Sequence, residues 1–288
     1  MSAEMSAVAR ERVAGLVAVG VSALVGRGAT AALRRWPPGG AGRWTRTNHA
    51  GRPISLLEGP GYVAGSLAGA GAWSVSAATV APSLVAAGGA GLAGLIDDLF
   101  GDSGDKGLRG HLRALRRGKV STGVVKIVLL AGAGVGTAYL IDQGNDRALP
   151  VPTTLLGAGV VAGAANLSNL LDLRPGRALK ATLLAAAPLT IGALPANPDA
   201  VRIAASAAGA ALGTLRADLA GETMLGDTGA NAAGALLGAA LVARTGLLGR
   251  TGALGVLTAL TLLSEKRSFT SIIESTPVLR ELDAWGRG

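Results

Sequence analysis

Two adjacent carboxylates, Asp97 and Asp98, follow a run of apolar residues and precede a segment rich in Gly, Lys and Arg. Neighbouring ionised carboxylates repel each other, and the carboxyl end of a helix already carries partial negative charge. A bound cation would relieve both effects. Oxygen ligands beside basic residues favour Mg²⁺ or Mn²⁺, which proteins usually hold through carboxylates and substrate phosphates. The alternative is that the pair only marks the water boundary after a membrane helix.

The basic segment after this pair contains three candidates for phosphate contacts: Lys106, Arg109 and His111. Cationic side chains bind the non-bridging oxygens of phosphates and stabilise the charge that develops during phosphoryl transfer. The alternative for each of them is an ordinary solvated loop charge.

Two further polar motifs stand at the ends of apolar stretches. In Asn166-x-x-Asn169-x-x-Asp172 the spacing of three keeps the side chains on one face of a helix. In Gly-Asp227-Thr228-Gly a carboxylate precedes another apolar run. The alternatives are hydrogen bonds between helices for the first motif, and an ordinary helix N-cap at Asp227 or Thr228 for the second.

The composition indicates a membrane protein. Of its 288 residues 49% are hydrophobic and 16% are charged, and the mean hydropathy is +0.44. The absence of Cys excludes disulfides and thiolate metal sites, and two His leave little for zinc. The formal charge of +9 is explained first by basic cytoplasmic loops, so no nucleic-acid partner is expected.

The apolar segments predict an all-α polytopic bundle with about nine transmembrane helices, because each segment is long enough to approach the thickness of a bilayer. Residues 1–264 would form one transmembrane domain, and residues 265–288 an amphipathic tail at the cytoplasmic interface. The expected spans are 13–33, 60–77, 79–96, 120–141, 150–171, 178–196, 199–217, 228–244 and 250–264.

The distribution of charge predicts the topology. Most of the 27 Lys and Arg residues fall in the loops after the odd-numbered spans, which are therefore expected to be cytoplasmic. The N-terminus would lie outside and the C-terminus inside. All three acidic motifs then share the cytoplasmic face, where carboxylates, a cation and basic side chains could act on a phosphoester. Small residues on the helix faces would also allow a homodimer.

The order, spacing and sidedness of these motifs resemble those of the polyprenyl-phosphate N-acetylhexosamine-1-phosphate transferases, the family that includes phospho-N-acetylmuramoyl-pentapeptide transferase. Asp97-Asp98 is similar to the family's Asp-Asp pair, and the Asn166 motif to its Asn-x-x-Asn-x-x-Asp sequence. Asp227 falls in the counterpart of its Gly-Asp-x-Gly motif. Arg52-Pro-Ile-Ser55 falls where the family has a basic residue and a turn.

The resemblance implies transfer of a sugar-1-phosphate from a UDP-N-acetyl-sugar to a polyprenyl phosphate in the plasma membrane, with Mg²⁺ and release of UMP, for cell-envelope glycans such as peptidoglycan. Asp97, Asp98 and Asp227 would be catalytic and metal-binding. The substrate-binding residues would be Asn166, Asn169, Asp172, Arg52 and Ser55, and we add the phosphate candidates Lys106, Arg109 and His111.

An alternative function remains open because the family's His-rich motif is absent after Lys266. The chain could be a catalytically silent relative that binds prenyl phosphate or UDP-sugar as a membrane partner in envelope assembly. A transporter is less favoured, since transport sites usually lie near the bilayer midplane and these carboxylates gather at one face.

Overall fold

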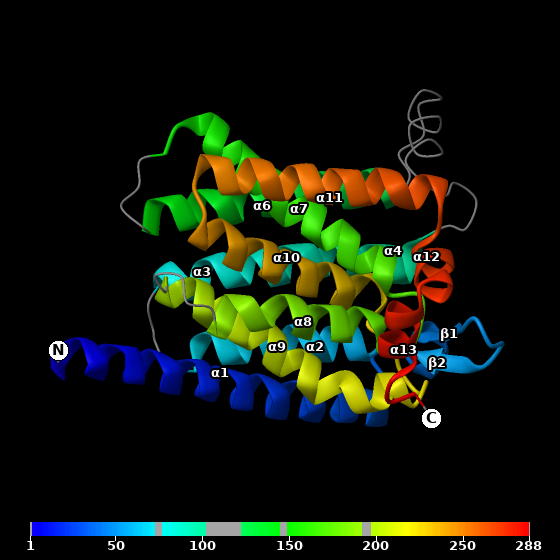
Figure 1. Cartoon of the computed structure of the whole chain (residues 1–288). Helices are drawn as coiled ribbons and strands as arrows, with labels where there is room; N and C mark the ends of the chain where they lie inside the picture. The colour runs from blue at the N-terminus through cyan, green and yellow to red at the C-terminus, as the bar shows by residue number, and fades with distance from the viewer. Residues whose placement is uncertain (1, 73–76, 102–121, 145–148, 192–196, 288) are drawn as a thin grey trace.

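The computed structural model describes residues 2–72, 77–101, 122–144, 149–191 and 197–287. Helices lie side by side in a bundle, and a small two-stranded sheet covers one end of it, which we call the hairpin end (Figure 1). The elements are α1 (Ser2–Arg35), η1 (Ala41–Arg43), β1 (Thr45–Thr47), β2 (Pro53–Ser55), α2 (Glu58–Gly71), α3 (Ala77–Ser83), the π-helical turn η2 (Leu84–Gly89), α4 (Ala90–Phe100), α6 (Thr122–Gly144), α7 (Val151–Leu171), α8 (Arg177–Ile191), α9 (Pro198–Leu219), α10 (Gly226–Arg244), α11 (Leu247–Lys266), α12 (Phe269–Ser275) and α13 (Pro277–Ala284).

Five of the described helical stretches are long and apolar enough to cross a membrane, which confirms the prediction of a helical bundle of membrane type. The helices α2 and α8 are shorter than the spans expected at 60–77 and 178–196, with 14 and 15 residues respectively. The five stretches are Arg12–Arg35, Val80–Phe100, Thr122–Gly144, Val151–Leu171 and Leu247–Lys266.

Helix α10 lies at the centre of the bundle and is buried along most of its length. Its sequence is almost entirely Ala, Gly and Leu, so neighbouring helices can approach it closely on every side. It packs against α7, α4, α9 and α2. Polar groups at the start of α10 are therefore surrounded by the ends of several other helices.

The hairpin of β1 and β2 is fixed over the junction between α9 and α10. The two strands are antiparallel, and the Asn48 side chain closes their turn by accepting the backbone N–H groups of Ala50 and Arg52, both at 2.9 Å. The backbone of Ser55 accepts from Met224 at 3.0 Å and donates to Glu222 at 3.2 Å. These bonds join the first loop of the chain to a segment far along the sequence.

The C-terminal tail forms α12 and α13, which fold back against the start of α8 at the hairpin end (Figure 1). Ser268 caps α12 by accepting the backbone N–H of Ser271 at 3.2 Å. Val278, Leu282 and Trp285 of the tail remain exposed, as an amphipathic segment requires.

Candidate functional site

Four polar side chains from four helices meet at the hairpin end, and we call them the Lys126 cluster. The ammonium of Lys126, on α6, contacts Asp227 Oδ2 of α10 closely and lies 3.4 Å from Asp97 Oδ2 of α4. With the Asn169 amide oriented to satisfy its neighbours, its nitrogen donates to Asp227 Oδ1 at 2.8 Å and its oxygen accepts from Lys126 at 3.0 Å. Two acidic motifs and one Asn motif, far apart in the sequence, therefore converge.

Asp98 points to the start of α10 and fills the role of its cap. Its Oδ1 accepts the backbone N–H of Asp227 at 3.0 Å, and its Oδ2 accepts the N–H and hydroxyl of Thr228 at 2.9 and 2.6 Å. A carboxylate at this place satisfies unpaired N–H groups and favours the positive end of the helix dipole. Neither Asp227 nor Thr228 caps its own helix, so the N-cap alternative for those residues is wrong.

Two glycines make this approach of α4 and α10 possible. A Cβ on Gly94 would lie 2.2 Å from the backbone of Asp227, so any side chain there would push the helices apart. Gly226 has φ +59°, and a Cβ there would meet both oxygens of Asp98 at 3.0 Å.

Among the described residues, the carboxylates of the site outnumber its ammonium groups; the basic residues of 102–121 lie outside these residues. Within this part of the chain, Asp97 and Asp227 contact the ammonium of Lys126, and the guanidinium of Arg46 reaches the backbone carbonyl of Asp98. The oxygen donors suit a small hard cation such as Mg²⁺ in chemical type. Within the described ranges, however, no three acidic or imidazole side chains are arranged as ligands of one metal ion. Lys126 lies between the two carboxylates that would be the first candidates.

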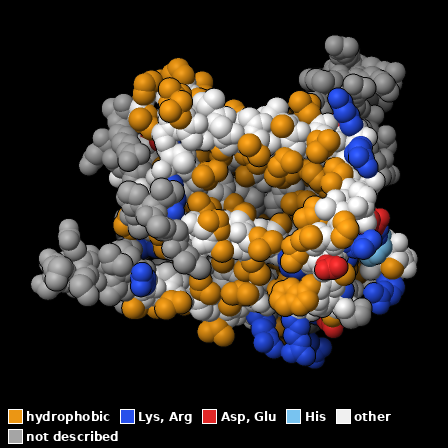
Figure 2. Space-filling model, viewed as in Figure 1, with side chains coloured by type: hydrophobic (Ala, Val, Ile, Leu, Met, Phe, Trp, Pro, Cys, Tyr) orange, Lys and Arg blue, Asp and Glu red, His pale blue; other side chains and the backbone are white. Residues whose placement is uncertain are grey.

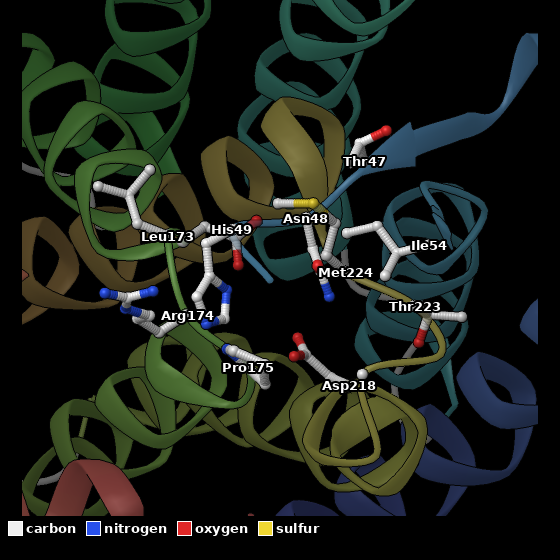
Figure 3. Close-up of a pocket in the computed structure, with 12 residues that line it drawn as sticks. Thr47, Asn48, His49, Ile54, Leu173, Arg174, Pro175, Asp218, Thr223 and Met224 are labelled. Atoms are coloured by element: carbon white, nitrogen blue, oxygen red, sulfur yellow. The ribbon is translucent and has the colours of Figure 1, made fainter. Parts of the chain in front are cut away.

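A pocket of about 230 Å³ lies beside this cluster, between the hairpin and the loop before α8 (Figure 3). We call it the polar pocket because several charged and polar side chains line it, although hydrocarbon makes up most of its exposed lining. In the close-up, Asn48 and His49 lie on the hairpin side of the space, and the Asp218 carboxylate lies across it. The lining residues are Thr47, Asn48, His49, Ile54, Asp172, Leu173, Arg174, Pro175, Asp218, Gly221, Thr223 and Met224.

The floor of the polar pocket is acidic and buried. Asp172 is 5% exposed and accepts the backbone N–H of Gly226, while its Oδ2 has no hydrogen-bond partner among the described residues. Burial, followed by the nearby carboxylate of Asp218, raises the pKa of Asp172 well above its ordinary value. Glu58 is fully buried behind it and accepts the hydroxyl of Thr223. Such a floor suits a ligand group that offers hydrogen-bond donors.

The rim of the polar pocket is cationic. Burial lowers the pKa of His49, and the nearby guanidinium groups of Arg174, Arg287, Arg52 and Arg177 lower it further. A basic rim over an acidic floor fits a ligand that has an anionic part and a neutral part with N–H groups.

Other predicted residues have different surroundings. Asn166 turns to α11 and donates to Thr261 Oγ1 at 3.4 Å, as the alternative of a bond between helices expected. Ser55 accepts the N–H of Leu57 with its hydroxyl at 3.3 Å and does not line the polar pocket. Arg52 lies beside Gly221 at the pocket rim. The phosphate candidates Lys106, Arg109 and His111 lie outside the described residues.

Three residues of this region were not singled out from the sequence: Lys126, Glu58 and Asp218. Lys126 stands inside an apolar helix, and an ionisable side chain there is by default a functional candidate. That signal was present and could have been used. Glu58 and Asp218 stand at helix ends, where single carboxylates are common, so the sequence carries no comparable signal for them.

An apolar cavity of about 530 Å³ lies between α7, α8, α10 and α11. Figure 2 shows the bundle hollowed between α11 and α8, with hydrophobic side chains around the hollow. One end of the cavity is lined by Leu167, Ser168 and Leu171, so this end lies at the same level along α7 as Asn169 of the Lys126 cluster.

Neither the protein-family models nor the curated proteins compared with this chain give a match. The function therefore has to be argued from the residues and the geometry.

Proposed function

We propose that the chain transfers a sugar-1-phosphate, of N-acetylhexosamine type, from a UDP-sugar to a polyprenyl phosphate and releases UMP. The observation that carries this proposal is the convergence of Asp97, Asn169 and Asp227 on Lys126. The three motifs that resemble the transferase family thus supply side chains to one place.

The two cavities match the two substrates. The polar pocket, with its basic rim and acidic floor, suits a uridine diphosphate whose base offers an N–H group. The apolar cavity suits an isoprenoid chain, because it is lined almost entirely by hydrocarbon. Between them, the Lys126 cluster stands where the lipid phosphate would meet the β-phosphate.

In the proposed reaction an oxygen of the lipid phosphate attacks the β-phosphorus of the UDP-sugar. The bond from that phosphorus to the oxygen bridging it to the α-phosphate breaks, and UMP leaves with that oxygen. Lys126 binds phosphate oxygens, and Asp97 or Asp227 takes up any proton on the attacking phosphate. Asn169 holds Asp227 in orientation, and Asp98 fixes the start of α10 beneath it.

Mg²⁺, or Mn²⁺, held by Asp97 and Asp227, would supply neutralisation of the phosphate charge. For it to bind, Lys126 must give up its contact with those carboxylates. In the membrane we propose about nine spans, with the hairpin end on the cytoplasmic side of the plasma membrane, following the distribution of Lys and Arg.

One observation favours the silent relative as a second candidate. The ammonium of Lys126 already occupies the space between the two carboxylates that a metal ion would need. A protein that only binds its ligands can keep this ion pair permanently.

The test is release of UMP by the detergent-purified protein with undecaprenyl phosphate, Mg²⁺ and a panel of UDP-N-acetyl-sugars. We expect metal-dependent release with one sugar, lost in Asp227→Asn and kept in Glu265→Gln, which changes an exposed carboxylate at the same end of the bundle. If no sugar in the panel gives UMP, while the protein still binds UDP-sugar or lipid, the catalytically silent relative becomes the favoured function.

A further inference from the structure

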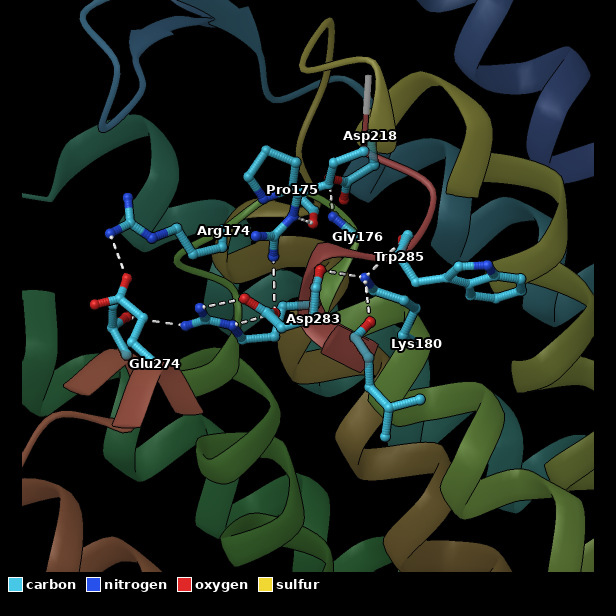
Figure 4. Close-up of polar contacts among 12 residues, drawn as sticks. Arg174, Pro175, Gly176, Lys180, Asp218, Glu274, Asp283 and Trp285 are labelled. Carbon is cyan, nitrogen blue, oxygen red and sulfur yellow. Dashed lines mark hydrogen bonds and ion pairs between the residues drawn. The ribbon is translucent and has the colours of Figure 1, made fainter. Parts of the chain in front are cut away.

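The C-terminal strap, which we define as residues 269–287, is attached to the start of α8 by a buried ion pair. Arg177 is 5% exposed, and its Nε and Nη2 donate to the two oxygens of Asp283 at 2.8 and 2.9 Å. Its Nη1 donates to Thr270 Oγ1 at 2.9 Å. This bidentate ion pair fixes the orientation of the strap relative to α8 as well as its distance (Figure 4).

Further contacts of the strap reach the residues that line the polar pocket. Arg287 Nε donates to the carbonyl of Pro175 at 2.8 Å, and Arg174 lies 3.3 Å from Glu274. Lys180 donates to the backbone carbonyls of Leu282 and Trp285 at 2.9 and 3.1 Å (Figure 4). The strap therefore holds the same loop, after α7, that contributes Arg174 and Pro175 to the pocket.

Hydrophobic burial contributes little to this attachment. Phe269 is the buried hydrophobic residue of the strap, whereas Val278, Leu282 and Trp285 stay exposed. The contacts with the pocket loop are ion pairs and hydrogen bonds to charged groups. The strap also places Arg287 beside the pocket loop, where its Nε donates to the carbonyl of Pro175 and its Nη2 lies 2.8 Å from Asp283 Oδ1.

We propose that the strap forms an outer wall behind the loop that lines the polar pocket, and that the guanidinium of Arg287, held beside this loop by Pro175 and Asp283, binds the phosphate-bearing part of the ligand. Asp283 and Arg177 are positioning residues that hold this wall in place. The inference rests on the proposed function, since the ligand is taken to be a nucleoside diphosphate.

The experiment measures binding of UDP, and separately of pyrophosphate, to the full chain in detergent by calorimetry. We expect Arg287→Ala to weaken UDP binding about tenfold, the order expected for losing one charge-assisted hydrogen bond. Arg280→Ala removes the same charge from the exposed side of α13 and should leave UDP affinity unchanged. In turnover, Arg287→Ala should raise KM for the UDP-sugar with little change in kcat, and Arg287→Lys should restore part of the affinity.

Asp283→Asn tests the wall itself. We expect faster hydrogen exchange in residues 172–177 together with weaker UDP binding, because the pocket loop loses its anchor. The inference is overturned if Arg287→Ala binds UDP as Arg280→Ala does, or if Asp283→Asn frees the strap without changing UDP affinity. It is also overturned if the wild-type chain binds neither UDP nor pyrophosphate.

The outcomes separate this inference from the proposed function. UDP binding that depends on Arg287, without any transfer of sugar phosphate, would contradict the transferase function and support the role of the strap. Transfer of sugar phosphate that is unaffected by Arg287→Ala would support the transferase function and contradict the role of Arg287.

Discussion

The two ends of the bundle each hold a cation among carboxylates or carbonyls, buried in the case of Arg250 and partly exposed in that of Lys126, and they differ in how the charges are paired. At the end away from the hairpin, Arg250 donates to Asp142 at 2.6 and 3.1 Å and to the carbonyls of Thr153, Val242 and Thr245, each at 3.1 Å. We call this the Arg250 cluster. In the described part of the chain, one cation meets one carboxylate there and its remaining donors meet carbonyls, so the charges of this cluster are balanced.

The Lys126 cluster has the opposite character. One ammonium serves Asp97 and Asp227, with Asp98 nearby, and the acidic floor of the polar pocket adds more negative charge. Among the described residues, the Arg250 cluster is a balanced network that joins helices, whereas the Lys126 cluster has more carboxylates than ammonium groups. We therefore assign a structural role to the Arg250 cluster and, under the proposed function, ligand binding to the Lys126 cluster.

The largest expected effect separates the two ends by activity. Asp227→Asn should lower UMP release by about 10³-fold or more, because the side chain loses its charge while keeping its shape. Its thermal unfolding should stay within a few degrees of wild type. A similar loss of turnover from changes confined to the Arg250 cluster, in protein that is still folded, would contradict the comparison.

The next effect separates the two ends by stability. Arg250→Met should lower the free energy of unfolding by about 3–5 kcal/mol, because it leaves the buried carboxylate of Asp142 without its partner. Unfolding in detergent, followed by circular dichroism, measures this loss. Adding Asp142→Leu to the same chain should restore much of the stability, and failure to do so would show that the cluster does more than balance charge.

A smaller effect is expected at the junction of α4 and α10. Asp98→Asn should cost about 1–2 kcal/mol, because one oxygen that accepts from the first turn of α10 becomes an amide. Thr228→Ala, which removes one of the three bonds, should cost about 1 kcal/mol. If both variants unfold as wild type does, Asp98 is not the cap of α10.

The smallest effect concerns pH. Since the pKa of Asp172 is raised in the folded chain, the folded state holds this proton more tightly than the unfolded state, whose value is about 3.9. Stability from this group is complete below about pH 4 and is lost as the pH rises through the raised pKa. Asp172→Asn should flatten that decline, and unfolding midpoints measured across the pH range would show an unchanged slope if the idea is wrong.

The sequence alone was enough to predict the position of polar residues that stand at the end of an apolar run. Asp97 and Asp98 follow an apolar run, and Asn169 shares a helix face with Asp172, so the amino-acid sequence alone assigns these residues to one end of a bundle. Hydropathy likewise predicted a bundle of apolar helices, of which five in the described residues are long enough to cross a membrane. The distinct roles of Asp97 and Asp98 could not be foreseen, because they depend on which helix α4 meets.

Other features depend on contacts between distant segments. Asn166 has the same spacing as Asn169 but faces Thr261, and only the position of α11 decides this. The strap was predicted to lie at an interface, yet its polar side is anchored by Arg177, which the sequence shows only as one more basic residue. Spacing within one segment predicts neither partner.

The capping of α10 by Asp98 has a consequence for how the protein is made. The partners of this carboxylate lie 129 and 130 positions later in the chain, so they are synthesised long after α4 is complete. Until α10 has been synthesised, the N–H groups that Asp98 accepts at the end of α4 are absent. A nascent or truncated chain that stops before Gly226 therefore cannot assemble the arrangement, and the Lys126 cluster forms only once the bundle has its central helix.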